Sequence, residues 1–557
     1  MSNLNDVISN MMRGAPQPRS RRQGVSKSDI EQRLVHYEET SEGFSVTGEH
    51  AAAAKAIFCD VANVFVTGGA GTGKTSFVRT VVIPELNHRG LNFAVTATTG
   101  VAGSLLDGKT LHSWAGIGLG PYFPPTVGPP QDLRIDRLLH YYEETYDEWV
   151  NTKKMSPKAR SGIRSRIQGT EVLLLDEVSM CAGAALLGYL DYFCKKVRNR
   201  EDVPFGGIQM IFIGDFAQLP PVEKDDTSRH ADWAFLSAAW KAANVRTTEL
   251  TRVFRQSDRE FAGFLNQIRL GQPVDPTYLT GFVKPLTPEE AIQASYLVPT
   301  NAQADRINKM ALERYPGPTV EIPAQFVIEP TLLESYEDVS RVKQQLLQGK
   351  VVKDVLELRE GLPVMLTVND PAAAYVNGTK AFVRSFERTS DGQVESVSVG
   401  IPFPEPRADG VTEALIRLGR RCTTRNQKED ADDLTQIYEA ERDVVTEEEL
   451  IAARASENPN AEEQLRKRRH EAAFRTTHQW PVLKQFPLIP ASAVTVHKAQ
   501  GSSLDECVVD LKQSFAPGHV YVAMSRLRTA AGLTLTSTDF RIKVDRDAME
   551  FYRALRQ

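Results

Sequence analysis

The chain has 557 residues, enough for about three or four domains at roughly 150 residues each. Apolar residues make up 41% of it and charged residues 25%, which excludes a mostly disordered or collagen-like chain. The net charge of −5 argues at first against nucleic acid, but residues 428–471 carry fourteen acidic and seven basic side chains. The rest of the chain is therefore weakly basic at +2, which permits a nucleic-acid partner without indicating one.

Several features that would indicate a membrane or secreted location are not found in the sequence. No run approaches about 18 consecutive apolar residues, so we expect no transmembrane helix. Residues 1–23 have no apolar segment of the kind found in signal peptides. The five cysteines are scattered without a C-x-x-C pair, which argues against a zinc site or a disulfide framework. We expect a cytoplasmic protein, while the basic residues 13–22 leave the nucleus or the mitochondrion open.

The first half of the chain predicts one α/β unit. Residues 1–45 are basic and rich in helix breakers, so we expect a disordered arm there. Residues 46–245 alternate helical stretches with short apolar runs, which predict parallel strands covered on both faces. These runs lie at residues 63–67, 92–96, 172–175 and 209–213. Residues 116–168 interrupt the pattern with a proline-rich stretch and then a charged helical one, so we expect an insertion.

The second half predicts another α/β unit that is itself interrupted. Residues 297–308 and 491–511 have the α/β pattern, so we assign residues 246–360 and 481–557 to this unit. Between them, β-like alternation and an Asn377-Gly378 turn predict a small β insertion over residues 361–480. Its acidic part, residues 428–471, has helical composition. A solvated helical arm and a partner-binding arm are both compatible with that composition.

A phosphate-binding loop is predicted at residues 68–75 (GGAGTGKT), between a strand and a helix. Glycines let backbone N–H groups close around phosphate oxygens, and the helix N-terminus adds its positive end. We expect Lys74 to reach the β- and γ-phosphates and the Thr75 hydroxyl to bind Mg²⁺. The predicted nucleotide-binding residues are Gly68, Gly69, Ala70, Gly71, Thr72, Gly73, Lys74 and Thr75.

Two further strands end in polar side chains that suit hydrolysis. Residues 173–177 (LLLDE) end in Asp176, expected to hold Mg²⁺, and Glu177, expected to orient or deprotonate the attacking water. Residues 212–221 (FIGDFAQLPP) place Gln218 where it could bridge the γ-phosphate to the rest of the site, although an ordinary turn is an equal alternative. Because nucleotide binding alone does not need Glu177, we favour hydrolysis.

Together these blocks resemble the PIF1 family of DNA helicases, in the RecD-like branch of helicase superfamily one that also holds the phage helicase Dda. The most specific blocks are residues 110–118 (TLHSWAGIG), 495–501 (TVHKAQG) and 521–526 (YVAMSR). The resemblance spans residues 47–540 and implies two RecA-like domains, with parallel sheets flanked by helices and ATP in the cleft between them. It also implies an inserted pin or wedge region, a small β-barrel-like insertion and a charged helical insertion.

The resemblance assigns roles around the nucleotide. It implies catalytic roles for Lys74, Glu177, Gln218, Arg255 and Arg526, and both arginines would stabilise charge on the transferring phosphoryl group. Gly501 would lie in the loop that links ATP to the DNA strand. His50 occupies the position of the adenine-reading glutamine of the family. A neutral histidine donates and accepts only through separate nitrogens, so adenine selectivity is relaxed or comes from elsewhere.

The resemblance also implies a set of DNA contacts rich in hydroxyl groups. These are Thr96, Thr98, Thr99, His112, Ser113, Trp114, Thr495, His497, Lys498 and Tyr521. Trp114 stands where the family usually has Phe, and it would offer a stacking face to a base. Ordinary core packing is the alternative for Trp114 and His112.

The function implied is an ATP- and Mg²⁺-dependent DNA helicase that moves 5′-to-3′ on single strands and unwinds duplexes in replication, repair or recombination. We expect a monomer that binds single-stranded and tailed duplex DNA but no membrane, with replication or repair proteins as candidate partners of residues 428–471. Three alternatives remain open. They are a RecD-type subunit or a conjugative or phage replication helicase, an ATP-driven translocase that does not separate strands, and an enzyme whose track is RNA.

Overall fold

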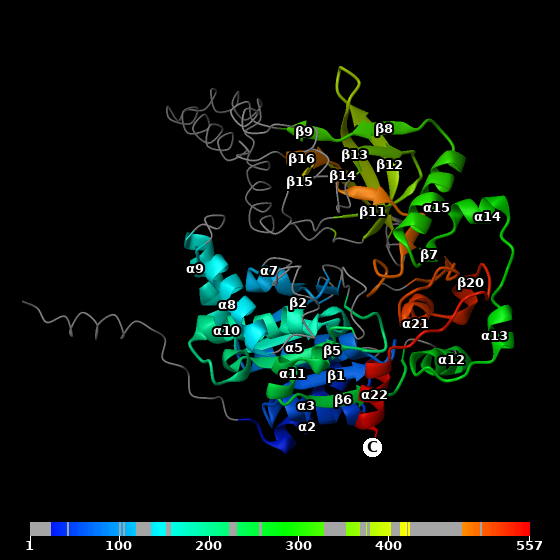
Figure 1. Cartoon of the computed structure of the whole chain (residues 1–557). Helices are drawn as coiled ribbons and strands as arrows, with labels where there is room; N and C mark the ends of the chain where they lie inside the picture. Colours follow the sequence, from blue (N-terminus) through cyan, green and yellow to red (C-terminus); the bar gives the residue numbers. More distant parts are fainter. Residues whose placement is uncertain are drawn as a thin grey trace, which may run out of the picture.

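The computed structural model describes residues 24–41, 44–99, 102–103, 106–117, 135–151, 157–221, 231–254, 259–327, 353–367, 375, 379–402, 413–419, 421–423, 482–501 and 504–556. The predicted α/β class is confirmed, because two parallel sheets are each accompanied by helices (Figure 1). A group of antiparallel strands lies apart from both of these sheets. None of the helices in these ranges is long and apolar enough to span a bilayer.

The first sheet has parallel strands in the order β3-β2-β4-β5-β1-β6. They are β1 (Val64–Gly68), β2 (Phe93–Ala97), β3 (Lys109–Thr110), β4 (Val172–Asp176), β5 (Gln209–Gly214) and β6 (Arg246–Leu250). Every residue of β1 and β4 is buried, as expected for apolar strands covered on both faces. Because parallel strands end at the same edge, the loops after β1, β4 and β5 meet there.

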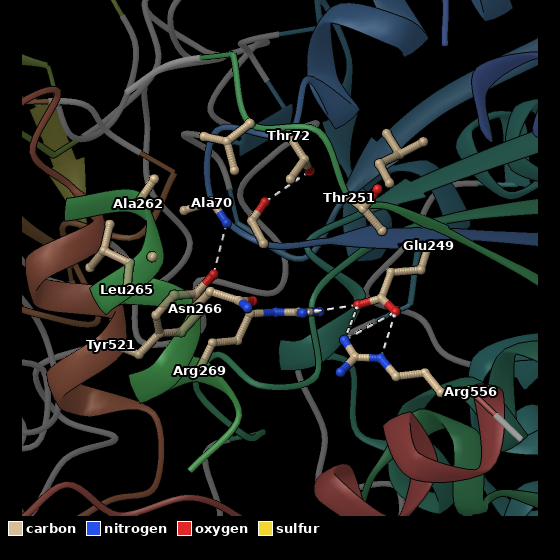
Figure 2. A pocket seen from close by; sticks show the side chains of 14 residues that line it. Ala70, Thr72, Glu249, Thr251, Ala262, Leu265, Asn266, Arg269, Tyr521 and Arg556 are labelled. Carbon is tan, nitrogen blue, oxygen red and sulfur yellow. Dashed lines mark hydrogen bonds and ion pairs between the residues drawn. The ribbon is translucent and has the colours of Figure 1, made fainter. Parts of the chain in front are cut away.

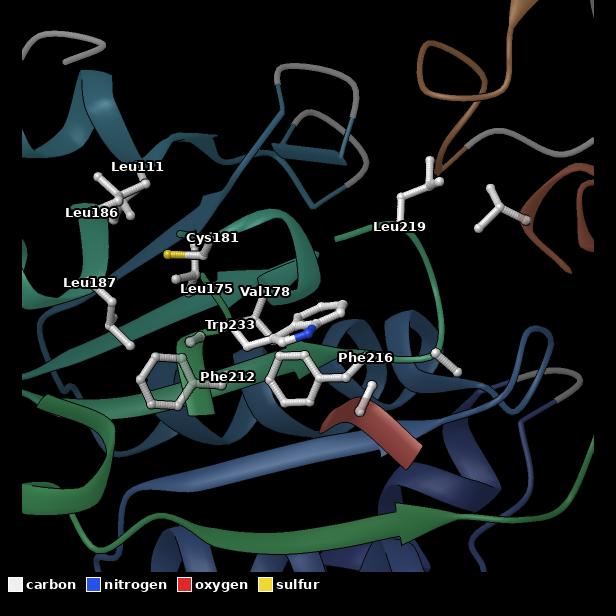
Figure 3. Close-up of a cluster of buried hydrophobic side chains, with 14 of the residues drawn as sticks. Leu111, Leu175, Val178, Cys181, Leu186, Leu187, Phe212, Phe216, Leu219 and Trp233 are labelled. Carbon is white, nitrogen blue, oxygen red and sulfur yellow. The ribbon is translucent and has the colours of Figure 1, made fainter. Parts of the chain in front are cut away.

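Two separate cores cover the opposite faces of this sheet, because successive side chains of a strand point to opposite sides. Val66 and Leu174 belong to one core, and Leu175, Phe212 and Trp233 belong to the other (Figure 3). The first core includes α3 (Gly48–Phe58), α4 (Lys74–Phe77) and α5 (Ile83–His88). The second includes α7 (Leu111–Ala115), α10 (Tyr189–Arg198) and α11 (Ala238–Ala242).

The predicted disordered arm is wrong over α2 (Lys27–Thr40), which packs on the first domain. Ser26 Oγ caps this helix by accepting the backbone N–H of Asp29 at 3.1 Å. Ile30 and Leu34 are buried in the same core as α3. The helical spacing of these two residues is present in the sequence. The charged residues around them and the helix breakers before them nevertheless favoured the prediction of disorder. The rest of the basic arm, residues 1–23, lies outside the described residues.

The insertion predicted in the first domain contains the expected helices, α8 (Ile135–Asn151) and α9 (Pro157–Gly169). Its proline-rich part, residues 118–134, lies outside the described residues, so the pin or wedge stays a prediction. Arg166 donates hydrogen bonds from Nε to the carbonyl oxygen of Trp114 at 2.8 Å and from Nη2 to that of Ser113 at 3.1 Å. These bonds join α9 to α7.

The second sheet has parallel strands in the order β18-β7-β19-β20. They are β7 (Tyr296–Val298), β18 (Ala493–Thr495), β19 (Cys507–Val509) and β20 (Leu533–Leu535). The helices of this part of the chain are α12 (Arg259–Arg269), α13 (Pro276–Thr280), α14 (Pro288–Gln293), α15 (Asn301–Arg314) and α21 (His519–Ser525). Strands from both sides of the long insertion therefore pair in one sheet.

The insertion in the second domain is antiparallel, with strand orders β14-β13-β12-β11-β17, β15-β16-β9 and β10-β8. Its strands are β8 (Val320–Pro323), β9 (Gln325–Val327), β10 (Val355–Leu358), β11 (Pro363–Leu366), β12 (Lys380–Arg388), β13 (Val394–Pro402), β14 (Glu413–Leu418), β15 (Arg421–Thr423), β16 (Val482–Gln485) and β17 (Leu488–Pro490). The predicted limits, residues 361–480, are too narrow, because strand pairing begins at β8 and continues to β17. The acidic residues 428–471 lie outside the described residues.

The first domain holds two elements that the predicted boundaries assign to the second. Strand β6 lies beyond residue 245, yet it pairs with β1. Helix α22 (Arg546–Leu555) comes from the end of residues 481–557, yet it packs on the first sheet (Figure 1). The Tyr552 hydroxyl lies 2.8 Å from Thr67 Oγ1, and the Phe551 ring contacts Phe65 and Phe216. A short strand and an amphipathic helix do not reveal from their sequence which sheet they join.

Tyr552→Ala is expected to lower the free energy of unfolding of the first domain by about 3–5 kcal/mol, because it empties a buried aromatic site. Tyr552 is 2% exposed, whereas Arg553 on the same helix is exposed and Arg553→Ala should change stability by no more than about 0.5 kcal/mol. Urea denaturation followed by tryptophan fluorescence compares the two. If Tyr552→Ala lowers the free energy of unfolding no more than Arg553→Ala does, the packing of α22 does not stabilise this domain.

Candidate active site

The predicted phosphate-binding loop follows β1 and leads into α4. Gly71 and Gly73 have φ values of 76° and 82°, a left-handed conformation that glycine adopts without strain. Lys74 Nζ donates hydrogen bonds to the carbonyl oxygens of Gly68 at 2.7 Å and Gly69 at 3.0 Å. Burial lowers the pKa of Lys74, and the negative charges of Asp215 and Glu177 oppose that shift. The lysine charge is therefore held next to the loop that it is predicted to serve.

A cavity of about 220 Å³ lies between this loop and the second domain. It brings together most of the predicted catalytic residues, although they are far apart in the sequence. Its lining residues are Ala70, Gly71, Thr72, Gly73, Lys74, Thr75, Ser76, Ala102, Asp176, Glu177, Gln218, Phe254, Gly501 and Arg526. Gly501 and Arg526 come from the second domain, so both domains form this site.

The two carboxylates after β4 have different surroundings. Asp176 accepts the backbone N–H of Glu177 at 2.8 Å. Burial, followed by the charge of Glu177, raises the pKa of Asp176 to about 7. Glu177 has a φ of 53°, which is uncommon for a residue with a side chain and typical of functional turns. A hydroxyl at Thr75 and a carboxylate at Asp176 are oxygen donors of the type that Mg²⁺ prefers.

Gln500 is a central residue of the site that the sequence prediction missed. Its Nε2 donates to Glu177 Oε2 at 3.2 Å and to Gln218 Oε1 at 3.1 Å. The following residue, Gly501, has a φ of 81°, and a side chain there would begin 3.9 Å from Glu177 Oε1. Gln500 lies within the TVHKAQG block, so its amide directly before a glycine was the available indication. It links the second domain directly to the predicted hydrolytic residues.

One of the two predicted arginines can be placed. Arg526 lines the cavity, is buried, and donates from Nε to the carbonyl oxygen of Val522 at 3.0 Å and from Nη2 to Ser525 Oγ at 3.0 Å. Its guanidinium is thus hydrogen-bonded to its own helix at the edge of the cavity. Arg255 lies outside the described residues, so its role stays a prediction.

His50 lies behind the cavity and does not line it, so the structure does not show the direct base contact predicted for it. Its ring stacks on Phe77 at 5.0 Å and faces Phe254 at 6.3 Å between centroids, and Phe254 does line the cavity. Nδ1 accepts the backbone N–H of Thr47 at 3.1 Å, whereas the buried Nε2 has no hydrogen-bond partner among the described residues. Burial lowers the pKa of His50 and favours the neutral ring. The loop amides and the half-buried Lys74, which do line the cavity, fit the phosphates of a nucleotide.

Metal chemistry outside this site finds no support in the described part of the chain. No group of three or more His, Cys, Asp or Glu side chains there could hold a metal ion. A Mg²⁺ ion held by Thr75, Asp176, water and phosphate oxygens does not require such a group.

Four predicted DNA contacts are buried in structural positions, which corrects their assignment. Thr96 is 0% exposed and donates from Oγ1 to the carbonyl oxygen of Leu174 at 2.6 Å. Thr495 is buried, and its Oγ1 accepts the backbone N–H of Lys498 at 3.4 Å. Trp114 is 2% exposed and lies in the core that contains Leu175 and Phe212. It therefore offers no face for stacking on a base, and core packing, the alternative given for it, is the correct interpretation.

Tyr521 is the fourth corrected residue. It is buried, and its hydroxyl accepts the backbone N–H of Ala70 in the phosphate loop at 2.7 Å and donates to Asp215 Oδ2 at 3.1 Å. The other predicted DNA contacts are half-buried or exposed and remain predictions. They are Thr98, Thr99, His112, Ser113, His497 and Lys498.

Asp215 and Arg269 form a second feature that the sequence prediction missed. Arg269 donates from Nε to Asp215 Oδ2 at 2.9 Å and from Nη2 to Oδ1 at 3.1 Å, and both side chains are buried. Asp215 stands in the FIGDFAQLPP block at the end of an apolar strand, which was an available indication. Arg269 carries no motif, and only the fold brings it to Asp215.

These features define a two-domain nucleotide-binding protein with a phosphate loop. A family model described as PIF1-like helicase matches residues 49–123 and 146–277. The chain belongs to the PIF1-like helicase family.

Relatives of known name extend this match over most of the chain. An ATP-dependent DNA helicase PIF1 of Emericella nidulans is 33% identical over 509 residues, which cover 88% of this chain and 61% of that protein. One of Saccharomyces cerevisiae is 30% identical over 554 residues, covering 88% and 60%. The chain thus spans about three fifths of the length of these two curated relatives.

Solved structures support the fold. The crystal structure of Pif1 helicase from Candida albicans is 27% identical with a TM-score of 0.65, and the likeness covers 92% of this chain and 99% of that one. The two RecA-like domains predicted from the sequence are thereby confirmed. A Bacteroides Pif1 helicase in complex with ADP-AlF₃ and single-stranded DNA has the same fold, with a TM-score of 0.62 at 24% identity over 92% and 98% of the two chains.

Lys74→Ala is expected to reduce ATP hydrolysis by about 10²–10³-fold, because it removes the cation next to the phosphate loop. The control is Lys55→Ala, at an exposed position of α3, which should keep wild-type activity. Phosphate release measures both, and circular dichroism verifies the fold. More than a tenth of wild-type activity in Lys74→Ala would contradict the assigned phosphate site.

Lys498→Ala is expected to weaken binding of single-stranded DNA and to reduce the slope of log affinity against log salt by about 0.7, the value for one lost phosphate contact. Lys241→Ala, exposed on α11 of the first domain, is the matched control and should leave the slope unchanged. Fluorescence anisotropy over a salt series measures both. An unchanged slope in Lys498→Ala would remove this residue from the DNA interface.

Proposed function

We propose that this chain is an ATP-dependent DNA helicase that moves 5′-to-3′ along single-stranded DNA and separates duplex DNA. One observation carries the proposal. Residues 495–501 place the exposed Lys498 only two residues before Gln500, which is hydrogen-bonded to Glu177 and Gln218. A change at the nucleotide therefore reaches a candidate DNA contact through one short segment.

In the proposed reaction, ATP lies in the cavity shared by both domains. Lys74 and Arg526 stabilise the charge on the transferring phosphoryl group, and Glu177 positions the attacking water. Thr75 and Asp176 would hold Mg²⁺, which when bound would neutralise phosphate charge. Since Arg526 and Gly501 belong to the second domain, binding and hydrolysis of ATP favour different fits between the domains. Alternation between these domain arrangements moves the protein along the DNA strand in steps.

The relatives support the same assignment. Those of Emericella nidulans and Saccharomyces cerevisiae are named ATP-dependent DNA helicases, and a Bacteroides Pif1 structure holds single-stranded DNA. A further structure concerns unwinding at forked duplex DNA by two Pif1 helicases. For residues 428–471, the strong negative charge supports a docking role toward a replication or repair protein, with the helicase itself acting as a monomer.

The deciding experiment is strand displacement with ATP and Mg²⁺ on two matched duplexes, one with a 5′ tail and one with a 3′ tail. We expect only the 5′-tailed duplex to open, and Lys74→Ala to open neither. Opening of only the 3′-tailed duplex would contradict the proposed polarity. If neither opens while single strands still stimulate ATP hydrolysis, the protein is a translocase or a partner-dependent subunit. Stronger stimulation by RNA than by DNA would identify RNA as the track.

A further inference from the structure

A polar network that runs from buried Asp215 and Arg269 to the exposed Arg556 lies next to the ATP cavity, on the other side of the phosphate loop. A second cavity of about 290 Å³ opens there between the loop, α12, α21 and the C-terminal residues (Figure 2). Glu249 accepts hydrogen bonds from Arg269 Nη1 at 2.9 Å and from Arg556 Nη2 at 3.0 Å. Arg269 in turn holds Asp215 through two hydrogen bonds. The phosphate loop therefore rests on a fully paired set of charges.

Tyr521 joins this network to the phosphate loop. Its hydroxyl accepts the Ala70 N–H (Figure 2). The same hydroxyl donates to Asp215, so it bridges a loop amide and a buried carboxylate. The hydroxyl oxygen belongs to the second domain and lies between two residues of the first domain, Ala70 and Asp215. The bond to the half-buried Ala70 joins the second domain directly to the loop, so the hydroxyl fixes the distance between α21 and the loop.

Helix α21 carries two other contacts with the ATP site. At its N-terminus, Gly518 lies so close to the first domain that a side chain would begin 2.6 Å from the carbonyl oxygen of Gln218. At its C-terminus, Arg526 lines the ATP cavity. Tyr521 stands between these two points. The position of Arg526 relative to the phosphate loop therefore depends on two contacts earlier in the helix, the close approach at Gly518 and the hydrogen bonds of the Tyr521 hydroxyl.

We propose that Tyr521 is a positioning residue for ATP hydrolysis: its hydroxyl holds α21 against the phosphate loop and thereby places Arg526 for the transferring phosphoryl group. This inference rests on the proposed function. Tyr521 does not face the ATP cavity, so it acts on hydrolysis through Ala70 and Arg526. Misplacement of Arg526 weakens an interaction made mainly in the transition state, which lowers kcat more than it raises KM.

The matched control is Tyr552, a second buried tyrosine whose hydroxyl also donates to Asp215, at 2.8 Å. It bonds to Thr67 and to the backbone N–H of Phe216 but not to the phosphate loop. Tyr521→Phe and Tyr552→Phe each remove one hydroxyl from the same carboxylate. Only Tyr521→Phe also leaves the Ala70 N–H without its acceptor. Any general effect of weakening the Asp215 network should therefore occur in both variants.

DNA-stimulated ATP hydrolysis is measured for wild type, Tyr521→Phe, Tyr552→Phe and Lys74→Ala, with thermal melting as the check on folding. We expect Tyr521→Phe to lower kcat by about 10- to 100-fold, with KM for ATP and affinity for single-stranded DNA changed by less than about threefold. Tyr552→Phe should keep kcat within about threefold of wild type, although both variants lower the melting temperature.

Three outcomes overturn the inference while the wild type remains active. Equal kcat values in the two tyrosine variants would assign Tyr521 a structural role only. A higher KM with unchanged kcat would place it in nucleotide binding. A loss of DNA affinity as the main effect would restore it as a DNA contact. A wild type without ATP hydrolysis, indistinguishable from Lys74→Ala, would instead contradict the proposed function.

Discussion

The buried ion pair between Asp215 and Arg269 is the interaction on which the arrangement of the two domains depends. Burial alone would raise the pKa of Asp215, but the charge and hydrogen bonds of Arg269 outweigh it and hold that pKa below its ordinary value. The carboxylate also accepts hydrogen bonds from Tyr521, Tyr552 and the backbone N–H of Ala217. A buried charge is tolerated only when it is paired in this way, and loss of one partner typically costs about 3–5 kcal/mol.

This requirement explains why distant segments converge behind the phosphate loop. Asp215 follows β5 of the first sheet, Arg269 ends α12, Tyr521 lies on α21 and Tyr552 on the C-terminal helix α22. Arg269, Tyr521 and Tyr552 each donate to the Asp215 carboxylate. The C-terminal helix consequently returns to the first domain, and α21 is held where its far end reaches the ATP cavity. Pairing of one buried charge thus determines the geometry of a cleft that two domains share.

Two positively charged residues that line the cleft are hydrogen-bonded to neutral oxygens of their own elements. Lys74 donates to carbonyl oxygens of its own loop, and Arg526 donates to its own helix. Gln500 extends this arrangement toward residues 495–501, because its amide joins Glu177 and Gln218. Local hydrogen bonds therefore connect residues that line the nucleotide cavity, the domain interface and the segment that carries the candidate DNA contacts.

Features that depend on local pattern could be predicted from the amino-acid sequence. Apolar runs ending in GGAGTGKT and LLLDE predict the strands, the phosphate loop and the residues Lys74, Thr75, Asp176 and Glu177, because each motif carries its own backbone geometry. Features that depend on partners far apart in the chain emerge only when the chain is folded, and the fold places several residues accordingly. It buried Trp114 and Thr96, turned Tyr521 toward Ala70, and brought Arg269 to Asp215. Exposure and pairing are properties of the packed fold, and no short stretch of sequence contains them.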